Sequence, residues 1–178
     1  GLAWAQQDGN RIVTLADVAY PKALLDQPDP PVLLYAKGRI ELLNSPALGI
    51  VGSRNATKQG EANALAFAEA LAASGITIVS GMALGIDAAA HLGALRFPAA
   101  TIAVIGTGAD RIYPARNQGL ARTIAEQGLI ISEFTIGTPP LASNFPRRNR
   151  IIAGLGMGCL VVEAAQRSRS LITARLAA

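Results

Sequence analysis

The stretch Ile76-Thr77-Ile78-Val79-Ser80-Gly81-Met82-Ala83-Leu84-Gly85 decides the fold. Its first half is a short run rich in β-branched residues, which is typical of a buried strand, and its second half is a loop of small residues. Residues 86–96 follow with the spacing of a helix. A strand, a Gly-containing turn and a helix in succession are the first elements of a βαβ unit. The stretch therefore predicts a parallel sheet covered by helices.

The same rhythm continues on both sides of this stretch. Upstream, a strand at 48–51 precedes a loop at 52–57 and a helix at 60–73. Further strands are expected at 32–35, 101–105, 129–132 and 159–162, and helices at 116–127, 148–155 and 170–177. This alternation predicts an α/β fold with a doubly wound, mostly parallel (Rossmann-like) sheet flanked by helices. We expect residues 1–45 to form a lead-in packed on a core of residues 46–178.

The composition excludes several classes of protein. Half of the residues are hydrophobic (51%) and 16% are charged, which excludes a disordered chain. Residues 1–10 carry no signal-peptide pattern, and no apolar run reaches the roughly 18 residues of a membrane span, so we expect a cytoplasmic location with no membrane contact. With Cys159 and His91 as the single cysteine and histidine, a disulfide within the chain and a Cys/His zinc site are excluded. Neither a metal nor a cofactor is expected.

The charge is unevenly distributed. Residues 1–110 carry 7 Lys+Arg and 9 Asp+Glu, a net charge of −2, whereas residues 111–178 carry 9 Arg and 3 Glu, a net charge of +6. Of the 16 basic residues 13 are Arg, which binds phosphate in a bidentate manner and stacks on bases. The excess indicates a basic face for an anionic polymer, or scattered cations that keep an apolar domain soluble.

Three small loops follow the carboxyl ends of predicted strands, where open α/β sheets bind ligands. They are Gly52-Ser53-Arg54, the loop that begins Ser80-Gly81, and Gly106-Thr107-Gly108. Glycine allows close approach of a ligand to the backbone, and the following helix points its first N–H groups at an anion. Three such loops beside Arg54 favour phosphate binding, although any tight strand-to-helix turn also favours glycine.

The stretch Ser143–Arg150 is a second candidate site, expected as a loop. It contributes three cations, two amides and one aromatic ring: Arg147, Arg148, Arg150, Asn144, Asn149 and Phe145. Binders of single-stranded nucleic acid use cations for the backbone and aromatic rings for stacking on bases. The alternative is that Phe145 fills the core while the arginines cap the next helix.

Signs of catalysis are weak. Asp87 and His91 stand at i, i+4 on one predicted helix, a spacing more often structural than catalytic. Glu163, at the end of the last strand, either faces the crevice or bonds a loop N–H or an arginine, and Cys159 is expected as a buried small hydrophobe. No phosphate-binding Walker sequence and no nucleophile elbow is present, so we expect no enzyme activity.

In their order and spacing, several motifs together resemble the DNA-processing protein A (DprA/Smf) family. They are Tyr20-Pro21, residues 49–54, residues 79–87 with His91, residues 101–108, Tyr113-Pro114-Ala115-Arg116-Asn117, residues 131–133, residues 145–154, residues 161–164 and residues 170–174. The resemblance implies a Rossmann-like domain that binds single-stranded DNA, forms homodimers and loads the RecA recombinase during natural transformation. It also implies that Arg54, Phe145, Arg147, Arg148 and Arg150 line the DNA pocket.

The chain departs from the family pattern at three places. Arg169 stands where the family has Gly, and residues 95–100 replace a Gly-rich turn. The chain ends at Ala178, where the family continues, so we expect a core truncated at its C-terminal end. Two alternatives stay open beside the family reading: a nucleotide phosphoribohydrolase-like enzyme, whose Pro-Gly-Gly-x-Gly-Thr loop is absent here, and a dimeric interaction scaffold.

Overall fold

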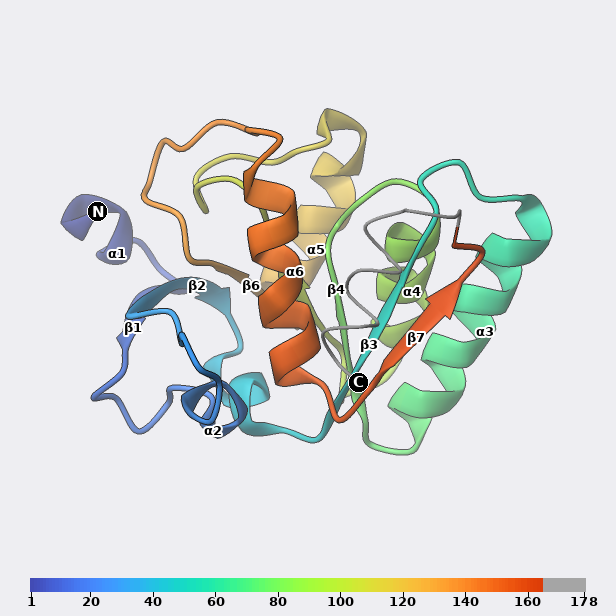
Figure 1. Cartoon of the computed structure of the whole chain (residues 1–178), viewed down its shortest axis with the longest axis horizontal. Helices are drawn as coiled ribbons and strands as arrows, with labels where there is room; N and C mark the ends of the chain where they lie inside the picture. Colours follow the sequence, from blue (N-terminus) through green and yellow to red (C-terminus); the bar gives the residue numbers. More distant parts are fainter. Residues whose placement is uncertain (165–178) are drawn as a thin grey trace.

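A computed structural model describes residues 1–164, and these residues form one mixed sheet of seven strands with helices on both faces (Figure 1). The strands are β1 (Asn10–Thr14), β2 (Leu33–Gly38), β3 (Ala47–Gly52), β4 (Thr77–Ser80), β5 (Thr101–Val104), β6 (Leu129–Ser132) and β7 (Cys159–Val162). The helices are α1 (Leu2–Ala5), α2 (Lys22–Leu25), α3 (Lys58–Ala73), α4 (Ile86–Ala94), α5 (Gln118–Gln127) and α6 (Asn144–Leu155), with 3-10 turns η1 (Ile40–Asn44) and η2 (Ala115–Asn117).

The sheet confirms the predicted fold class. Its order is β1-β2-β6-β5-β4-β3-β7, and the strands from β3 to β7 pair in parallel. Two antiparallel strands, β1 and β2, extend the sheet beyond β6. The sequence did not predict β1, because only Val13 of its five residues is buried and the apolar signal of a core strand is missing. Residues 10–14 and 33–38 thus belong to the same sheet as the later strands.

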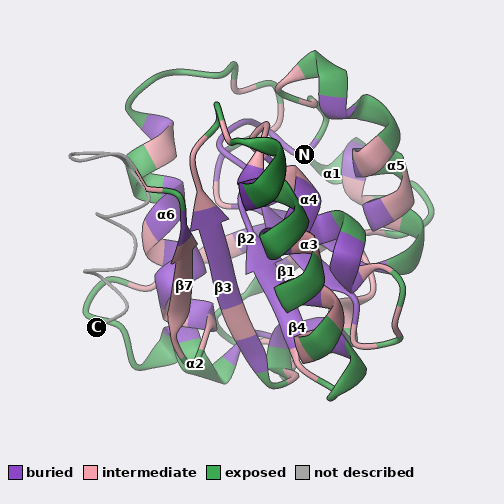
Figure 2. Ribbon diagram, turned by 90° about the vertical axis from the view of Figure 1, so that its right-hand side faces the viewer, coloured by how far each residue is buried: buried purple, intermediate pink, exposed green. Residues whose placement is uncertain are grey.

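Right-handed crossovers decide which face each helix covers. The chain moves in one direction through β3, β4, β5 and β6, so α3, α4 and α5 lie on one face, and α6 returns across the other face to reach β7 (Figure 1). Alternate strand residues serve the two faces: Ile50 and Ile78 pack under α3 and α4, whereas Val51 and Val79 pack under α6. Figure 2 shows the buried central strands behind helices whose outer faces are exposed.

Helix α6 corrects one prediction. The stretch from Ser143 was expected as a loop that leads to a helix near 148–155, but the helix already begins at Asn144. Pro146 is in its first turn, where a backbone N–H has no partner within the helix and proline costs nothing. The aromatic ring and the arginines of this stretch therefore project from a rigid helix.

Two sequence predictions concern the C-terminal end of the chain. The helix expected over 170–177 and the unusual Arg169 lie outside the described residues. Within residues 1–164, no helix has both the length and the apolar character needed to cross a membrane.

Candidate nucleic-acid interface

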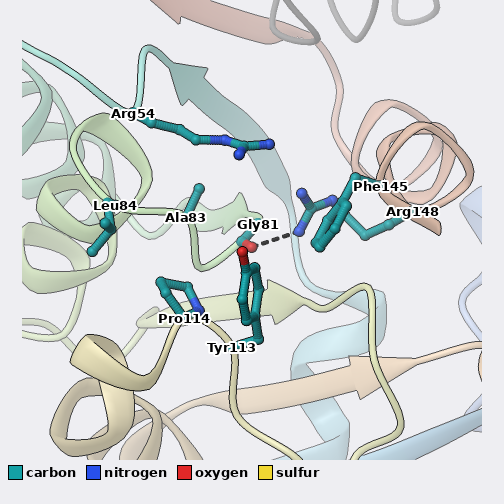
Figure 3. Close-up of a pocket in the computed structure, with 8 residues that line it drawn as sticks. All are labelled: Arg54, Gly81, Ala83, Leu84, Tyr113, Pro114, Phe145 and Arg148. Carbon is teal, nitrogen blue, oxygen red and sulfur yellow. Dashed lines mark hydrogen bonds between the residues drawn. The ribbon is translucent and has the colours of Figure 1, made fainter. Parts of the chain in front are cut away.

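A pocket lies at the carboxyl edge of the parallel strands, where the sequence predicted a ligand site. Its cavity volume is about 70 Å³, and it is open to solvent. Its lining comes from the segments that follow β3, β4, β5 and β6: Arg54, Gly81, Ala83, Leu84, Tyr113, Pro114, Phe145 and Arg148 (Figure 3). Four segments that are far apart in the sequence thus meet at one place.

The floor of the pocket is the turn after β4, and other elements hold it by its backbone. Met82 has a left-handed conformation with φ of 64°, which is strained for a residue with a side chain. Its N–H donates to His91 Nε2 at 3.2 Å, and its carbonyl accepts from Asn117 Nδ2 at 2.6 Å. The carbonyl of Gly81 accepts from Arg148 Nη1 at 2.5 Å. These three side chains fix a turn that would be costly to leave unsupported.

Asp87 and His91 do not form the pair that their spacing suggested, because each binds the same turn. Asp87 Oδ2 accepts from the N–H groups of Gly81 at 3.1 Å and Ala83 at 3.4 Å. His91 Nδ1 is 2.7 Å from Thr101 Oγ1, which itself donates to a β4 carbonyl. Since Nε2 accepts a hydrogen bond, the network assigns the ring proton to Nδ1. The backbone N–H groups of Gly81, Met82 and Ala83 are therefore already used and are not available to an anion in the pocket.

Burial shifts the pKa values of two side chains in the floor of the pocket, Asp87 and His91. It raises the pKa of the buried Asp87 carboxyl, and the charge of Arg148 opposes that rise. Burial, helped by the charge of Arg148, lowers the pKa of His91 to about 3. His91 is therefore neutral at physiological pH, and its Nε2 atom acts as an acceptor for the turn.

Arg148 belongs to the floor, although it lines the pocket. Only 6% of the residue is exposed. Besides Gly81, its Nη1 reaches the carbonyl of Val104 at 2.9 Å, and its Nε donates to Asn149 Oδ1 at 2.9 Å. The guanidinium thus joins α6 to the ends of β4 and β5, and it places one positive charge beneath the pocket.

Phe145 forms the centre of the rim. Its ring covers Gly106, where a Cβ atom would come within 2.9 Å of the ring. The guanidinium carbons of Arg54 and Arg148 are 5.9 Å and 5.4 Å from its centroid, and the Tyr113 ring is 5.8 Å away at a tilt of 40°. Arg54 points into the pocket from the opposite side (Figure 3). Its guanidinium makes no hydrogen bond and no ion pair to any residue in the range 1–164.

Three residues predicted for the site, Gly52, Ser53 and Ser80, lie outside the pocket. Ser80 is fully buried, and its hydroxyl donates to a β3 carbonyl at 2.6 Å. Gly52 lies so close to β7 that a Cβ atom would be 2.1 Å from a β7 carbonyl oxygen. Ser53 Oγ accepts the N–H two residues further on at 3.1 Å, which shapes the loop that carries Arg54. None of the three lines the pocket.

The remaining residues predicted for the site all lie on α6, and none of them lines the pocket. Asn144 and Asn149 are buried, and Asn144 Nδ2 donates to the main chain after β5 at 3.1 Å. Arg147 and Arg150 project away from the pocket. The Arg147 guanidinium carbon is 5.7 Å from the centroid of the Phe134 ring, and Arg150 forms an ion pair on that side. The helix thus brings Phe145 and Arg148 to the pocket and separates them from the other two arginines.

The sequence did not single out Tyr113 and Pro114 as site residues, although both line the pocket. They follow β5 after several loop residues and carry no charge that would mark them. The one signal in the sequence that could have indicated them was the aromatic residue beside a proline in the family motif that begins Tyr113-Pro114. Tyr113 is 47% exposed, so its ring is accessible to a ligand.

The N-terminus of α3 is a second anion position at this edge, and the chain fills it itself. Glu163 accepts from the Thr57 N–H at 2.8 Å and from the Thr57 hydroxyl. A Cβ atom at Gly60 would be 2.2 Å from the Glu163 carboxyl carbon, so glycine makes room for it. The same hydrogen bonds lower the pKa of Glu163. Of the interpretations open for Glu163, the bond to a loop N–H is the one found.

The described residues offer no metal centre, since no group of three or more His, Cys, Asp or Glu side chains gathers among residues 1–164. Cys159 is partly buried and packs against the core under α6. Burial raises the pKa of its thiol to about 11, so the reactive thiolate is disfavoured.

Sequence comparisons identify similar proteins over the whole fold. The family described as DNA recombination-mediator protein A matches residues 11–178. Protein Smf of Escherichia coli is 47% identical over 177 residues, which cover 99% of this chain and 47% of that protein. DNA processing protein DprA of Streptococcus pneumoniae is 47% identical over 160 residues, or 90% of this chain and 56% of that protein. The chain spans about half the length of these curated relatives.

Two solved structures are also similar. The crystal structure of DprA from Streptococcus pneumoniae superposes with a TM-score of 0.91 and 44% identity, over 99% of this chain and 61% of that one. The structure of DNA processing protein A from Helicobacter pylori has a TM-score of 0.85 and 36% identity, over 93% and 75% of the two chains. The second structure is described as giving insight into the single-stranded DNA binding mode of that protein.

Proposed function

The chain belongs to the DNA recombination-mediator protein A family, and from this membership we propose that it binds single-stranded DNA in the pocket formed by Arg54, Tyr113 and Phe145. The observation that carries the proposal is the rim. An exposed cation, Arg54, has no hydrogen-bond or ion-pair partner among residues 1–164 and stands beside two aromatic rings, at the edge where parallel sheets bind their ligands. Cations for phosphates and rings for bases are what a single strand requires.

The rim suggests how one nucleotide is held. A base stacks on the Phe145 and Tyr113 rings, which every base can do, while Arg54 donates to a neighbouring phosphate. Arg148 adds a fixed positive charge from below without moving. The floor presents no free N–H groups from Gly81 to Ala83, so the binding depends on charge and stacking more than on base identity.

We infer no catalytic step at this site. Its titratable side chains, Asp87 and His91, are buried under the floor and bonded to the main chain, so neither reaches a bound substrate. For the whole protein we propose the roles that family resemblance implies: protection of a single strand in the cytoplasm during natural transformation, and its transfer to the RecA recombinase by a homodimer.

The test is the affinity for fluorescent oligo-dT at two salt concentrations. Arg54→Ala is expected to weaken binding and to reduce the salt dependence by about one phosphate contact. Phe145→Ala removes a stacking ring and is expected to cost about 1–3 kcal/mol of binding free energy. Arg11→Ala, which removes an exposed cation on the edge strand β1, outside the pocket, serves as the control and should bind almost like the parent.

The outcomes separate the proposal from its alternatives. Binding that falls with salt and weakens in both pocket variants supports a single-strand site at this edge. A folded parent that fails to bind even at low salt contradicts the proposal and favours an interaction scaffold. Equal weakening in Arg11→Ala would show that only the overall charge matters.

A further inference from the structure

A polar groove lies on the side of α6 that faces away from the pocket. It is lined by residues of the turn before β2, by the residue after β6 and by two arginines of α6: Asp29, Pro30, Pro31, Val32, Leu33, Glu133, Arg147 and Arg150. The family resemblance implied that both arginines line the DNA pocket, but the helix carries them here. The groove therefore needs an explanation of its own.

Glu133 leaves one buried oxygen atom unused in this groove. Its side chain is only 6% exposed, and Oε2 accepts from Arg150 Nη2 at 2.5 Å. Oε1 has no hydrogen-bond partner among residues 1–164. A buried acceptor without a donor is unfavourable, and more so when it is charged. A ligand that donates to Oε1 recovers this free energy.

The two arginines differ in how far they are already used. Arg150 is held on both sides, by Glu133 and by the carbonyl of Asp29 at 2.7 Å. Arg147 is exposed, lies over the Phe134 ring, and makes no hydrogen bond or ion pair within the described part of the chain. The groove thus presents one carboxylate acceptor and one available guanidinium donor side by side.

This chemistry selects a neutral ligand that has donors next to an acceptor. A lysine or arginine of a protein partner would satisfy Glu133, but it would meet the positive charges of Arg147 and Arg150. A nucleobase carries no charge. On its pairing edge, guanine places O6 beside two N–H donors, whereas thymine has one donor between two carbonyl groups. Guanine therefore matches a carboxylate beside an arginine, and thymine does not.

The groove is within reach of a strand bound in the pocket. Residues 145 and 148 project toward the pocket, and residues 147 and 150 project to the other side, as a rotation of about 100° per residue requires. A helix is about 10–12 Å across with its side chains, so a few nucleotides pass over the first turn of α6. Pro146, exposed in that turn, leaves the path open.

We propose that this groove is a base-reading subsite for the same single strand, in which Glu133 and Arg147 bind the pairing edge of a guanine. The inference rests on the proposed function, because the pocket holds the strand and the groove reads one base of it. It adds a base preference to a site that would otherwise bind by charge and stacking alone.

The test compares oligo-dT with a series of the same length that carries one dG at successive positions. The parent should bind the best-placed dG oligonucleotide about tenfold more tightly than oligo-dT, within the range of a good base contact. In Glu133→Gln the amide oxygen turns to Arg150 and the NH2 group faces the groove, so a donor meets a donor. The preference for dG should disappear, while the affinity for oligo-dT stays within about twofold of the parent.

Two further variants keep the outcomes distinct. Arg54→Ala should weaken binding of both oligonucleotides and keep their ratio, whereas Arg147→Ala should reduce the ratio. Glu61→Gln, an exposed carboxylate on α3, is the matched control, and thermal unfolding verifies that each variant is folded. Equal affinity for dG and dT in a parent that binds DNA overturns the subsite alone, as does a preference that survives in Glu133→Gln. No binding of any oligonucleotide overturns the proposed function as well.

Discussion

Arg148 and Arg54 line the same pocket, one in its floor and the other in its rim. The floor consists of Gly81–Ala83 with Asp87, His91 and Arg148, and its polar groups are bonded to the main chain. The rim consists of Arg54, Tyr113 and Phe145, and the Phe145 ring contacts both the Arg54 guanidinium and the Tyr113 ring. The residue type alone does not distinguish the two regions, since each contains an arginine of a family motif.

The hydrogen bonds of a side chain separate residues that support the pocket from residues whose polar groups remain available to a ligand. A buried side chain whose donors are all satisfied stabilises the fold, and its loss is measured as stability. An exposed cation without a partner has its binding capacity left for a ligand, and its loss is measured as affinity. Variants of the floor and of the rim should therefore differ in kind as well as in size.

The largest effect is expected for Arg148→Met. This change removes the donor from two buried carbonyl groups, those of Gly81 and Val104, and it releases the strained turn. The free energy of unfolding should fall by about 3 kcal/mol, as measured by urea denaturation. Arg54→Met is the matched control and should change it by less than about 0.5 kcal/mol. Equal losses in the two variants would contradict the division into floor and rim.

A pH dependence is expected from His91 in the floor. Its pKa in the folded protein is about 3, below the ordinary 6.5, so the unfolded chain takes up its proton first. The stability that neutral His91 contributes is complete above 6.5 and is lost as the pH falls toward 3. Between pH 6.5 and about 5, the parent should lose about 2 kcal/mol more than His91→Gln does. If the free energies of unfolding of the parent and of His91→Gln change equally with pH, the low pKa of His91 is wrong.

A smaller effect is expected in the rim for Tyr113→Ala. The ring is half exposed and contacts Phe145, so its loss should weaken binding of oligo-dT by about 1 kcal/mol with little change in stability. Fluorescence anisotropy measures the affinity, and Tyr113→Phe, which keeps the ring, should bind like the parent. If Tyr113→Ala binds normally, the rim is limited to Arg54 and Phe145.

The smallest effect is expected for Glu163→Ala. This exposed carboxylate caps α3 through Thr57 and lies outside the pocket. Its loss should lower the free energy of unfolding less than the floor variants do and should leave the affinity for DNA unchanged. Urea denaturation and anisotropy measure the two quantities. A clear loss of affinity would instead extend the rim to the N-terminus of α3.

Local sequence predicted much of this fold and failed where distant segments determine the conformation. The strands at the centre of the sheet were found because a strand buried on both faces is a continuous apolar run. The edge strand β1 was missed because it is half exposed. The early start of α6 was missed because Pro146 favours a loop in local terms, although the first turn of a helix accepts it.

The amino-acid sequence was sufficient to predict the parallel strands from β3 to β7, the family and most residues of the site, because these depend on apolar periodicity and on motifs that are local in the chain. Which of these residues face the pocket depends on the tertiary structure. It buried Arg148 and Ser80, left Arg54 exposed, added Tyr113, and sent Arg147 and Arg150 to the other side of α6. The physical reason is that burial and hydrogen-bond partners come from segments distant in sequence, and no local pattern records them.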